Sequence, residues 1–467
     1  MRPLRALCTL LSLGLPLGLL TGCMAPPLET SATPTRAAQQ ALPDLPPMKL
    51  FAASGAPDSL PISNADLARD FLDLSFQLES GRSLPVFTRF EGQIRVGLAG
   101  QVPPGMARDL DAVIARLRRE AGIDIIRLPS GYEGNLNINA VPGEEIRKEL
   151  PAAACFVVPG ITRLSQYRQA RRQDRTDWTR LKTRSKLAIF VPSDAAPQET
   201  RDCLHEELAQ ALGPLNDLYR LPDSTFNDDN IHSILTRYDM LILRMTYAPE
   251  LRSGMSRAEV QARLPDLLDR LNPGGRNVAP RHLGATPQAW MNEVARALGP
   301  GISPANRVRG ARQAVALAQS YGWTDHRLAF SYYMLGRLSQ SQDPRAAHRY
   351  LLQAHQLYSR DRGTRLHAAH TAVQLAAFAL AGGDPEKALA LLSGRAQVAR
   401  EYQNAMLLAN IEMLRAEALE QTGQPQEARR VRLDSLGWAR YGFGPDWAVR
   451  ARLQEIAALN PARGKSL

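Results

Sequence analysis

Strand-like and helical segments occupy different parts of this 467-residue chain, and this division most limits the folds open to it. Short apolar runs typical of buried strands end at Val191, whereas the periodic segments from Ala305 to Leu459 repeat at helical spacing. Residues 272–305 between them are rich in Pro and Gly, as connections between domains often are. We therefore expect an α+β domain over residues 64–272, a linker with one short helix over 273–304, and an all-α helical-repeat domain over 305–460.

The first domain mixes both kinds of element, and its composition suits a globular core: across the whole chain, 44% of residues are hydrophobic and 22% are charged. Hydrophobic periodicity predicts helices over residues 66–78, 106–121, 143–150 and 199–212. Alternation and short apolar runs predict strands over residues 87–98, 123–128, 136–141, 155–158 and 187–191.

The N-terminus has the features of an exported protein. Arg2 and Arg5 precede an apolar segment, Ala6 to Leu20, that is too short to span a membrane comfortably. The following Thr21-Gly22-Cys23 completes a tetrapeptide that resembles the lipobox of bacterial lipoproteins. The resemblance implies a lipoprotein signal peptide over residues 1–22 and a lipid on Cys23 that binds a membrane. The alternative is an ordinary export signal followed by a coincidental Cys.

The same resemblance implies a location in the cell envelope, on the periplasmic side. Met24 follows the lipidated Cys, and by analogy with enterobacterial sorting the absence of Asp there favours the outer membrane over the inner one. Residues 23–63 contain eight prolines among Ala, Ser and Thr, which predicts an extended tether. No nucleic-acid partner is expected in this compartment, although the formal net charge is +11.

That charge falls to +9 without the signal peptide and is concentrated in one segment. Arg163 to Lys186 carries nine bases against two acids. One interpretation is contact with anionic lipid or polyanionic envelope polymers. The other is a solvated insertion, which we favour because only Tyr167 and Trp178 provide aromatic rings among the bases.

Two cysteines remain if Cys8 leaves with the signal peptide and Cys23 carries lipid. In an oxidising periplasm Cys155 and Cys203 are expected to form a disulfide. The alternative is a catalytic thiol at Cys203 with His205. Because each step along a helix turns by about 100°, a spacing of two residues brings no particular geometry to that pair.

One segment, Cys203 to Asp217, has the features of a site. His205 and Glu206 begin like the zinc-binding H-E-x-x-H motif, but Ala209 stands where the second His is needed. Moving the frame by one residue matches every spacing of the metzincin motif H-E-x-x-H-x-x-G-x-x-H, which the segment therefore resembles. In that frame the three zinc ligands become Glu206, Gln210 and Asn216, the catalytic Glu is Glu207, and the helix-ending glycine is Gly213.

The resemblance implies a metzincin-like peptidase domain whose chemistry is degenerate. Zinc prefers imidazole and thiolate, whereas one carboxylate with two amides suits a hard divalent cation, and only weakly. We expect no resident cofactor; if a divalent metal binds, its candidate ligands are Glu206, Gln210 and Asn216. The residues expected to line a binding cleft are Glu206, Gln210, Asn216 and Asp217. The alternative is a scaffold helix whose polar groups hydrogen-bond one another.

A second resemblance is narrower. The helix E-E-x-x-Q-x-L-G-x-x-N-D, Phe226 to Asp229, Tyr238-Asp239 and Ala248 to Met255 are together similar to a proteobacterial family of domains of unknown function, often lipoproteins, over about residues 65–275. Cys155 and Cys203 fit the same pattern. It implies Met240, Met245 or Met255 as the counterpart of the metzincin Met-turn. For Asp228, Asp229 and Asp239 the choice is between a place in the cleft and the capping of turns and helices, the commoner role.

A weak repeat marks the all-α domain. Pro344 to Ala347, Pro385 to Ala388 and Pro425 to Ala428 share the pattern Pro-x-x-Ala, with the alanines 41 and 40 residues apart. They resemble the helix pairs of tetratricopeptide-like repeats, although the period is longer than 34 residues. Arg395 and Arg432 depart from the small or apolar residues expected there. We expect about four helix pairs in a solenoid; the alternative is an irregular helical bundle.

These observations give two main functional hypotheses, beside a third in which the helical repeats carry the whole function and the first domain is a spacer. The first is a lipid-anchored envelope protein with an inactive peptidase-like domain, whose helical repeats bind a protein partner in the envelope. The second is an active metal-dependent hydrolase of peptides or envelope polymers with Glu207 as general base.

Overall fold

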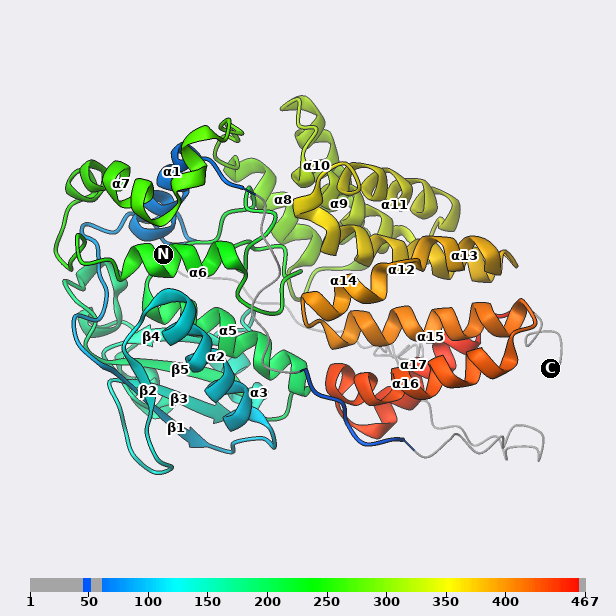
Figure 1. The fold of residues 1–467 in the computed structure, drawn as a ribbon, viewed down its shortest axis with the longest axis horizontal. Helices are drawn as coiled ribbons and strands as arrows, with labels where there is room; N and C mark the ends of the chain where they lie inside the picture. The colour runs from blue at the N-terminus through cyan, green and yellow to red at the C-terminus, as the bar shows by residue number, and fades with distance from the viewer. Residues whose placement is uncertain (1–44, 52–60, 462–467) are drawn as a thin grey trace, which may run out of the picture. The chain divides into compact units, whose positions relative to one another are not determined.

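The computed structural model describes residues 45–51 and 61–461, which belong to one compact unit beginning at Leu45 (Figure 1). The predicted signal peptide and the predicted lipidation site, Cys23, lie outside the described residues. Within the described part of the chain, no helix is long and apolar enough to cross a membrane.

The first part of the chain is built on a five-stranded sheet with the order β2-β1-β3-β5-β4. The strands are β1 (Ile94–Gly100), β2 (Ile125–Arg127), β3 (Leu136–Val141), β4 (Phe156–Pro159) and β5 (Leu187–Pro192). Neighbours from β2 to β5 run parallel, and β4 adds to the edge antiparallel to β5. Parallel strands require crossover connections, so helices alternate with strands here. The arrangement is thus α/β with a mixed sheet, and the predicted α+β class is corrected.

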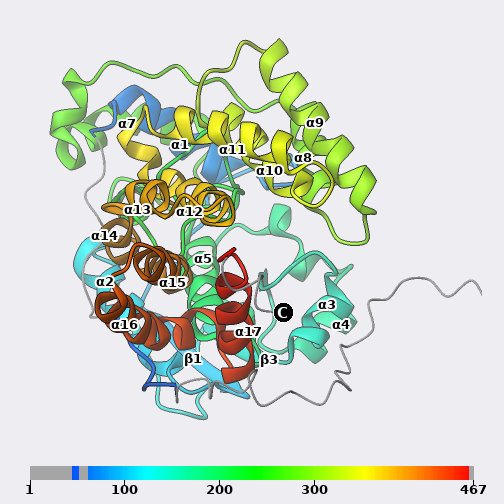
Figure 2. The ribbon, with the colours of Figure 1, turned by 90° about the vertical axis from the view of Figure 1, so that its right-hand side faces the viewer.

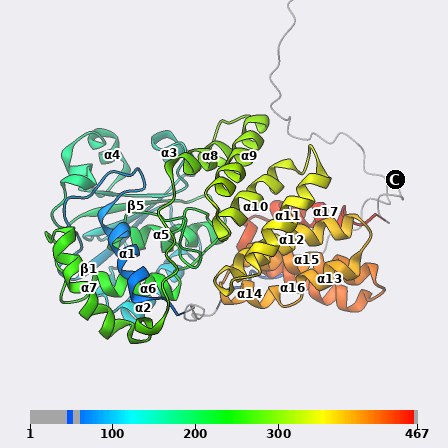
Figure 3. The same ribbon diagram turned by 90° about the horizontal axis from the view of Figure 1, so that it is seen from above.

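The two faces of the sheet carry different helices. Alternate residues of a strand point to opposite faces. Along β5, Leu187, Ile189 and Val191 join the main core, while Ala188 and Phe190 join a smaller cluster on the other face. On the main-core face lie α2 (Met106–Ala121) and α5 (Pro197–Leu212); the smaller cluster includes residues of α3 (Gly143–Glu149) and α4 (Leu164–Ala170) (Figure 3).

Most predicted elements of this part are present. The helix at 106–121 and the strand at 136–141 have the predicted bounds. The predicted strand at 87–98 is wrong in its first half, because Phe87 exchanges backbone hydrogen bonds with the turn at residues 254–255 and β1 begins only at Ile94. The other helices of this part are α1 (Asn64–Phe76), η1 (Asp174–Thr176), η2 (Trp178–Arg180), α6 (Arg237–Thr246), α7 (Arg257–Leu271) and η3 (Pro273–Asn277).

The described chain is helical from residue 288 onward. α8 lies beside α9 in all three views (Figures 1, 2 and 3), and Trp290 of α8 is buried in their shared core. The short helix of the predicted linker therefore packs with the helical part. The helices are α8 (Gln288–Leu298), α9 (Pro304–Ser320), α10 (His326–Ser339), α11 (Pro344–Tyr358), η4 (Arg362–Thr364), α12 (Arg365–Ala381), α13 (Pro385–Leu392), α14 (Arg395–Glu401), α15 (Ala405–Gln421), α16 (Pro425–Phe443) and α17 (Asp446–Ala457).

The Pro-x-x-Ala turns begin α11, α13 and α16, the second helices of successive pairs. Proline stands in the first turn of each helix, where its missing N–H costs no hydrogen bond. The alanines three residues on are buried, and α10 packs with α11, α12 with α13, and α15 with α16 (Figure 2). The middle pair is irregular, since α13 stops at Leu392 and Gly394, at φ 72°, separates it from α14.

Residues 45–51, which belong to the predicted tether, pack against α16. The backbone nitrogen of Lys49 donates to the carbonyl of Gly437 at 3.0 Å, and the Phe51 ring stacks on Trp438 with centroids 4.5 Å apart. This portion is therefore held on the helical part. Residues 23–44 and 52–60 of the tether lie outside the described residues.

The α/β part and the helical part also contact each other directly. Gln198 of α5 donates to Oδ1 of Asn404 at 3.2 Å, and Arg201 donates to the carbonyl of Gln403. Tyr402 donates its hydroxyl to Asp223 at 3.1 Å. The two predicted domains are thus joined through the start of α5 and the loop that follows this helix.

Candidate functional site

Helix α5 carries most of the predicted site residues, and its C-terminal end is held by a buried base. Arg184, from the predicted charge run, donates to the carbonyls of Gln210, Ala211 and Gly213, the second at 2.8 Å. The last carbonyls of a helix have no partner within it, and a cation there also interacts favourably with the helix dipole. Burial lowers the pKa of Arg184 to about 10.

Other bases of that run form ion pairs at the surface. Arg163 pairs with Glu133, and Arg168 pairs with Glu145 and Glu149. These surface pairs agree with a solvated insertion better than with a surface that binds a polyanion, whereas Arg184 is buried and belongs to neither.

Gly213 ends α5 where the metzincin-like frame predicted it. Its φ of −168° is open to any residue, so backbone conformation does not require glycine here. The lack of space does require glycine, because a Cβ at this position would lie 2.8 Å from Cγ2 of Thr246 on α6. The close approach of α6 to the end of α5 therefore depends on the missing side chain.

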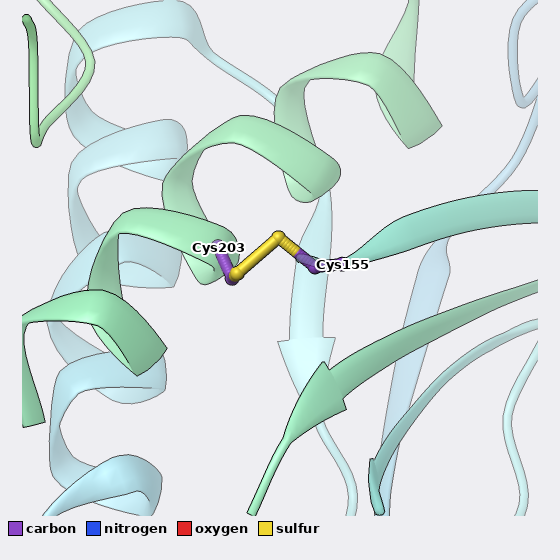
Figure 4. Close-up of a disulfide and its surroundings, with 2 residues drawn as sticks. All are labelled: Cys155 and Cys203. Atoms are coloured by element: carbon purple, nitrogen blue, oxygen red, sulfur yellow. A yellow bond between two sulfur atoms is a disulfide. The ribbon is translucent and has the colours of Figure 1, made fainter. Parts of the chain in front are cut away.

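The predicted disulfide is present and ties α5 to the sheet. Cys203 of α5 is bonded to Cys155, which directly precedes β4, with their Cα atoms 6.0 Å apart (Figure 4). The alternative of a catalytic thiol with His205 is thereby excluded. His205 instead accepts from the backbone nitrogen of Leu235 at 3.2 Å, and burial holds its pKa well below the usual range.

Carboxyl groups from three segments meet beside α5. We call Glu79, Glu206, Glu207, Asp217 and Asp228 the acidic cluster. Glu79 comes from the turn after α1, the two neighbouring glutamates from α5, and the two aspartates from the loop at residues 213–236. Gln210, one turn after Glu206, donates to Oε1 of Glu79 at 3.3 Å, and Tyr219 donates to Asp228 at 2.7 Å.

Each member of the acidic cluster has a raised pKa. For Glu206, burial and the charges of Glu79 and Asp228 raise the pKa to about 7. Burial and neighbouring carboxylates raise the pKa of Asp217 well above its usual range, and Asp217 is hydrogen-bonded to Glu79. Like charges held together titrate as a group, and the group retains protons at neutral pH.

Glu207 lies at the deepest point of the cluster. Its side chain belongs to a residue that is 4% exposed, and no hydrogen-bond partner among the described residues reaches its Oε2. Burial, Glu206 and Glu79 raise its pKa well above the usual range. Within the described chain, the groups that shift the pKa of Glu79, Glu206 and Glu207 include no Arg, Lys or His. A buried acceptor without a partner is costly unless it is protonated or bound.

Residues 64–266 match a family model described as a protein of unknown function (DUF2927). This match supports the domain of unknown function predicted from the sequence. No curated protein matches the chain.

Within the DUF2927 region, the predicted cleft residues separate into two groups. Glu206, Gln210 and Asp217 meet in or beside the acidic cluster, together with Glu207. Asn216 donates its amide to the carbonyl of Asp73 near the end of α1, at 3.0 Å, so this amide holds α1 against the loop. The place of Asn216 in a ligand site stays a prediction.

The sequence does not predict that Glu79 belongs to the site. It lies 127 positions before Glu206, in an exposed turn that resembles no motif, so only the packing of α1 on the α5 side of the domain reveals its role. Asp239 has the predicted capping role: it forms a capping box with Thr236 at the start of α6. Asp229 also caps a turn, because its Oδ1 accepts from the backbone nitrogen of Ile231 at 3.1 Å, and its Oδ2 lies 2.8 Å from Nε2 of His367 on α12.

The three Met-turn candidates also differ in their surroundings. Met240 and Met245 lie inside α6, whereas Met255 follows the turn at Ser253-Gly254 and is buried in the main core. Met255 is therefore the one candidate of the three that follows a turn.

The acidic cluster and a metal site are different arrangements. Among the described residues, no group of three or more His, Cys, Asp and Glu is placed to hold a metal ion. The carboxyls of the cluster are held instead by one another, by Gln210 and by Tyr219. Chemically, the arrangement can exchange protons near neutral pH and can accept hydrogen bonds from a cation.

A cavity of about 70 Å³ lies elsewhere, between α1, residues 220–224 and residues 278–283. Tyr238 lines it, and no partner within the described residues reaches its hydroxyl. The volume holds a few waters and is well below the roughly 300 Å³ at which small-molecule sites begin. We therefore interpret it as a hydrated gap beneath the linker.

Proposed function

We propose that the protein is a lipid-anchored envelope protein that binds a peptide or an envelope polymer at its acidic cluster, without zinc-peptidase chemistry. The helical part serves as its docking region for a protein partner. The observation that supports the binding role is the acidic cluster itself: among the described residues, Glu207 keeps an oxygen without a partner, and the groups that shift the pKa of Glu206 and Glu207 include no base.

The metzincin-like frame supports a retained scaffold with altered chemistry. Glu206 and Gln210 occupy one face of α5, and the helix ends at Gly213, in agreement with the frame. Carboxylate and amide oxygens replace imidazole at the ligand positions, and zinc binds such oxygen sets poorly. The amide of Asn216, at the third position, is engaged by α1.

Metal analysis combined with peptide assays tests this proposal. We expect purified protein to carry less than one zinc per chain and to leave peptide substrates intact. Stoichiometric zinc, together with cleavage that is lost in Glu207→Gln, would contradict the non-catalytic proposal. Glu386→Gln, on the exposed first turn of α13, serves as the control for the removal of one charge.

Attachment to the envelope depends on Cys23. We expect Cys23→Ser to release the protein from the membrane fraction while the soluble form keeps its fold, because the Cys lies outside the described compact unit. Fractionation measures the release from the membrane, and palmitate labelling measures the loss of the lipid. A variant that stays membrane-bound without lipid contradicts the anchoring role.

A hydrolase is the second candidate, and one observation favours Glu206 over the predicted Glu207 as its general base. Glu206 is half-buried with a pKa of about 7, close to the operating pH of a general acid or base, whereas Glu207 is buried. Cleavage of envelope polymers with a rate that follows an ionisation near pH 7 and is lost in Glu206→Gln supports this candidate. Loss in Glu207→Gln alone contradicts the assignment to Glu206.

A further inference from the structure

The members of the acidic cluster lie at different depths. Glu79 and Asp228 belong to exposed residues, Glu206 and Asp217 are half-buried, and Glu207 is buried. Protein atoms nevertheless crowd the carboxyls of the two exposed residues enough to raise their pKa values. The negative groups thus extend from the surface of the domain to a buried oxygen.

The polar contacts at each depth leave acceptors available. Gln210 and Tyr219 each donate one hydrogen bond, to Glu79 and Asp228 respectively. Glu207 Oε2 and Asp217 Oδ1 have no hydrogen-bond partner within the described chain. These two oxygens come from different segments, α5 and the loop at residues 213–236, and the two carboxyl groups are close enough for the charge of Glu207 to raise the pKa of Asp217.

From this arrangement we infer that the acidic cluster binds a lysine-type primary ammonium carried on an extended chain. The inference rests on the proposed binding function and names the ligand class for it. Glu79 and Asp228 attract the cation at the surface, and the ammonium donates its three N–H groups to the deeper carboxylates. A graded series of acids suits a flexible cationic side chain, which reaches inward from a peptide or polymer backbone that stays at the surface.

Binding of a cation is linked to the release of protons. The charged and titratable groups that face Glu206 are Glu79, Asp217, Asp228 and its α5 neighbours Asp202 and Glu207. An ammonium favours the ionised form of these carboxyls, so it lowers their pKa values and displaces protons. Affinity therefore rises with pH, most steeply as Glu206 titrates near pH 7.

Calorimetric titration of the full mature protein in detergent tests the inference. The probes are a terminally blocked Ala-Ala-Lys-Ala-Ala peptide and the same peptide with an acetylated lysine nitrogen. We expect the free amine to bind at least tenfold more tightly than the acetylated form, with protons released and affinity higher at pH 8 than at pH 6. We also expect Glu207→Gln to weaken binding of the amine by tenfold or more.

Two comparisons keep the result decisive. Glu79→Gln changes an exposed residue and also weakens binding if the cluster is the site, even where Glu207→Gln perturbs folding; Glu386→Gln leaves binding unchanged. Equal affinity for both peptides overturns the ammonium assignment but leaves the proposed binding function standing. Binding of neither peptide, or tight stoichiometric Ca²⁺ binding that the cluster variants abolish, also overturns the ammonium assignment. Failure of both the peptides and envelope-polymer fragments to bind overturns the proposed function itself.

Discussion

Arg184 shows how one residue of an apparent charge run has a purely internal role. The sequence places it among nine bases, but its guanidinium is buried and donates to three carbonyls at the end of α5. It also lies over the ring of Trp178, 5.2 Å from the centroid. Neither role has a signal in the local sequence, because both depend on where α5 ends.

Replacing Arg184 with Met should destabilise the fold strongly. The change removes charge-assisted hydrogen bonds and leaves buried carbonyls without partners, with an expected loss of about 3 kcal/mol or more. Urea denaturation followed by circular dichroism measures it. Arg163→Met, which removes an exposed pair with Glu133, is the matched control and should cost under about 1 kcal/mol. Equal losses in both variants would contradict the capping role.

Glu206 should make the stability of the protein fall as pH rises. Its pKa is about 7 in the fold, against an ordinary value of 4.5, so the folded state binds more protons than the unfolded state between these values. The contribution of Glu206 to the free energy of unfolding is therefore fully present below pH 4.5 and is lost as pH rises through 7. Asp202, with its pKa raised to about 8, acts in the same direction. Melting temperatures at pH 5 and pH 8 should differ less in Glu206→Gln than in the wild type.

At the scale of elements, the end of α5 requires close packing that glycine alone allows. A Cβ at Gly213 would meet Thr246 at 2.8 Å, so Gly213→Ala should cost about 1–3 kcal/mol through overpacking. Gly92→Ala is the control, because nothing lies within 4 Å of the position of its Cβ and its φ is not positive. The midpoint of thermal unfolding distinguishes the two, and no difference between them would refute the packing argument.

The disulfide between Cys155 and Cys203 closes a loop of 48 residues around β5 and the start of α5. In the chain-entropy model a loop of that length contributes roughly 4 kcal/mol. We expect the Cys155→Ser, Cys203→Ser double variant to lose stability of that order and to become insensitive to reducing agent. If the wild type is equally insensitive, the pair is reduced in solution.

The elements found from the sequence are those whose signals are local. Helix 106–121 has a clear apolar stripe and the strand at 136–141 a buried run, and both have the predicted bounds. The prediction of a strand from Phe87 onward is wrong, because buried residues that pack against a distant turn can alternate in the same way as residues of a strand. The sequence likewise predicts only the part of the site that is local. Glu206, Glu207 and Gln210 share one helix, whereas Glu79 is brought to them only by the fold.

At the scale of the whole molecule, the loop at residues 213–236 joins the acidic cluster to the helical part. Asp217 and Asp228 belong to the cluster, while Tyr219 packs against Trp290 and accepts at its carbonyl from His326, 2.7 Å away. The same loop places Asp229 against His367. The helical part therefore forms the support on which one side of the cluster rests, whatever partner it binds.

Breaking that support should weaken both parts together. His367 and Asp229 are buried; burial acts to raise the pKa of Asp229, but His367 and His232 hold it below the usual range. His367→Leu removes the hydrogen bond to Oδ2 of buried Asp229, which keeps the amide of Asn227 and the backbone nitrogen of Ile231 as donors, at a cost of about 1.5–3 kcal/mol. We expect hydrogen exchange to become faster in α5 as well as in α12, because Arg201 and Gln198 of α5 also depend on the helical part. A control, His348→Leu on α11, removes a histidine outside this interface and should leave α5 unchanged. Faster exchange confined to α12 would mean that the two parts are stabilised independently and that the cluster needs no support from the helices.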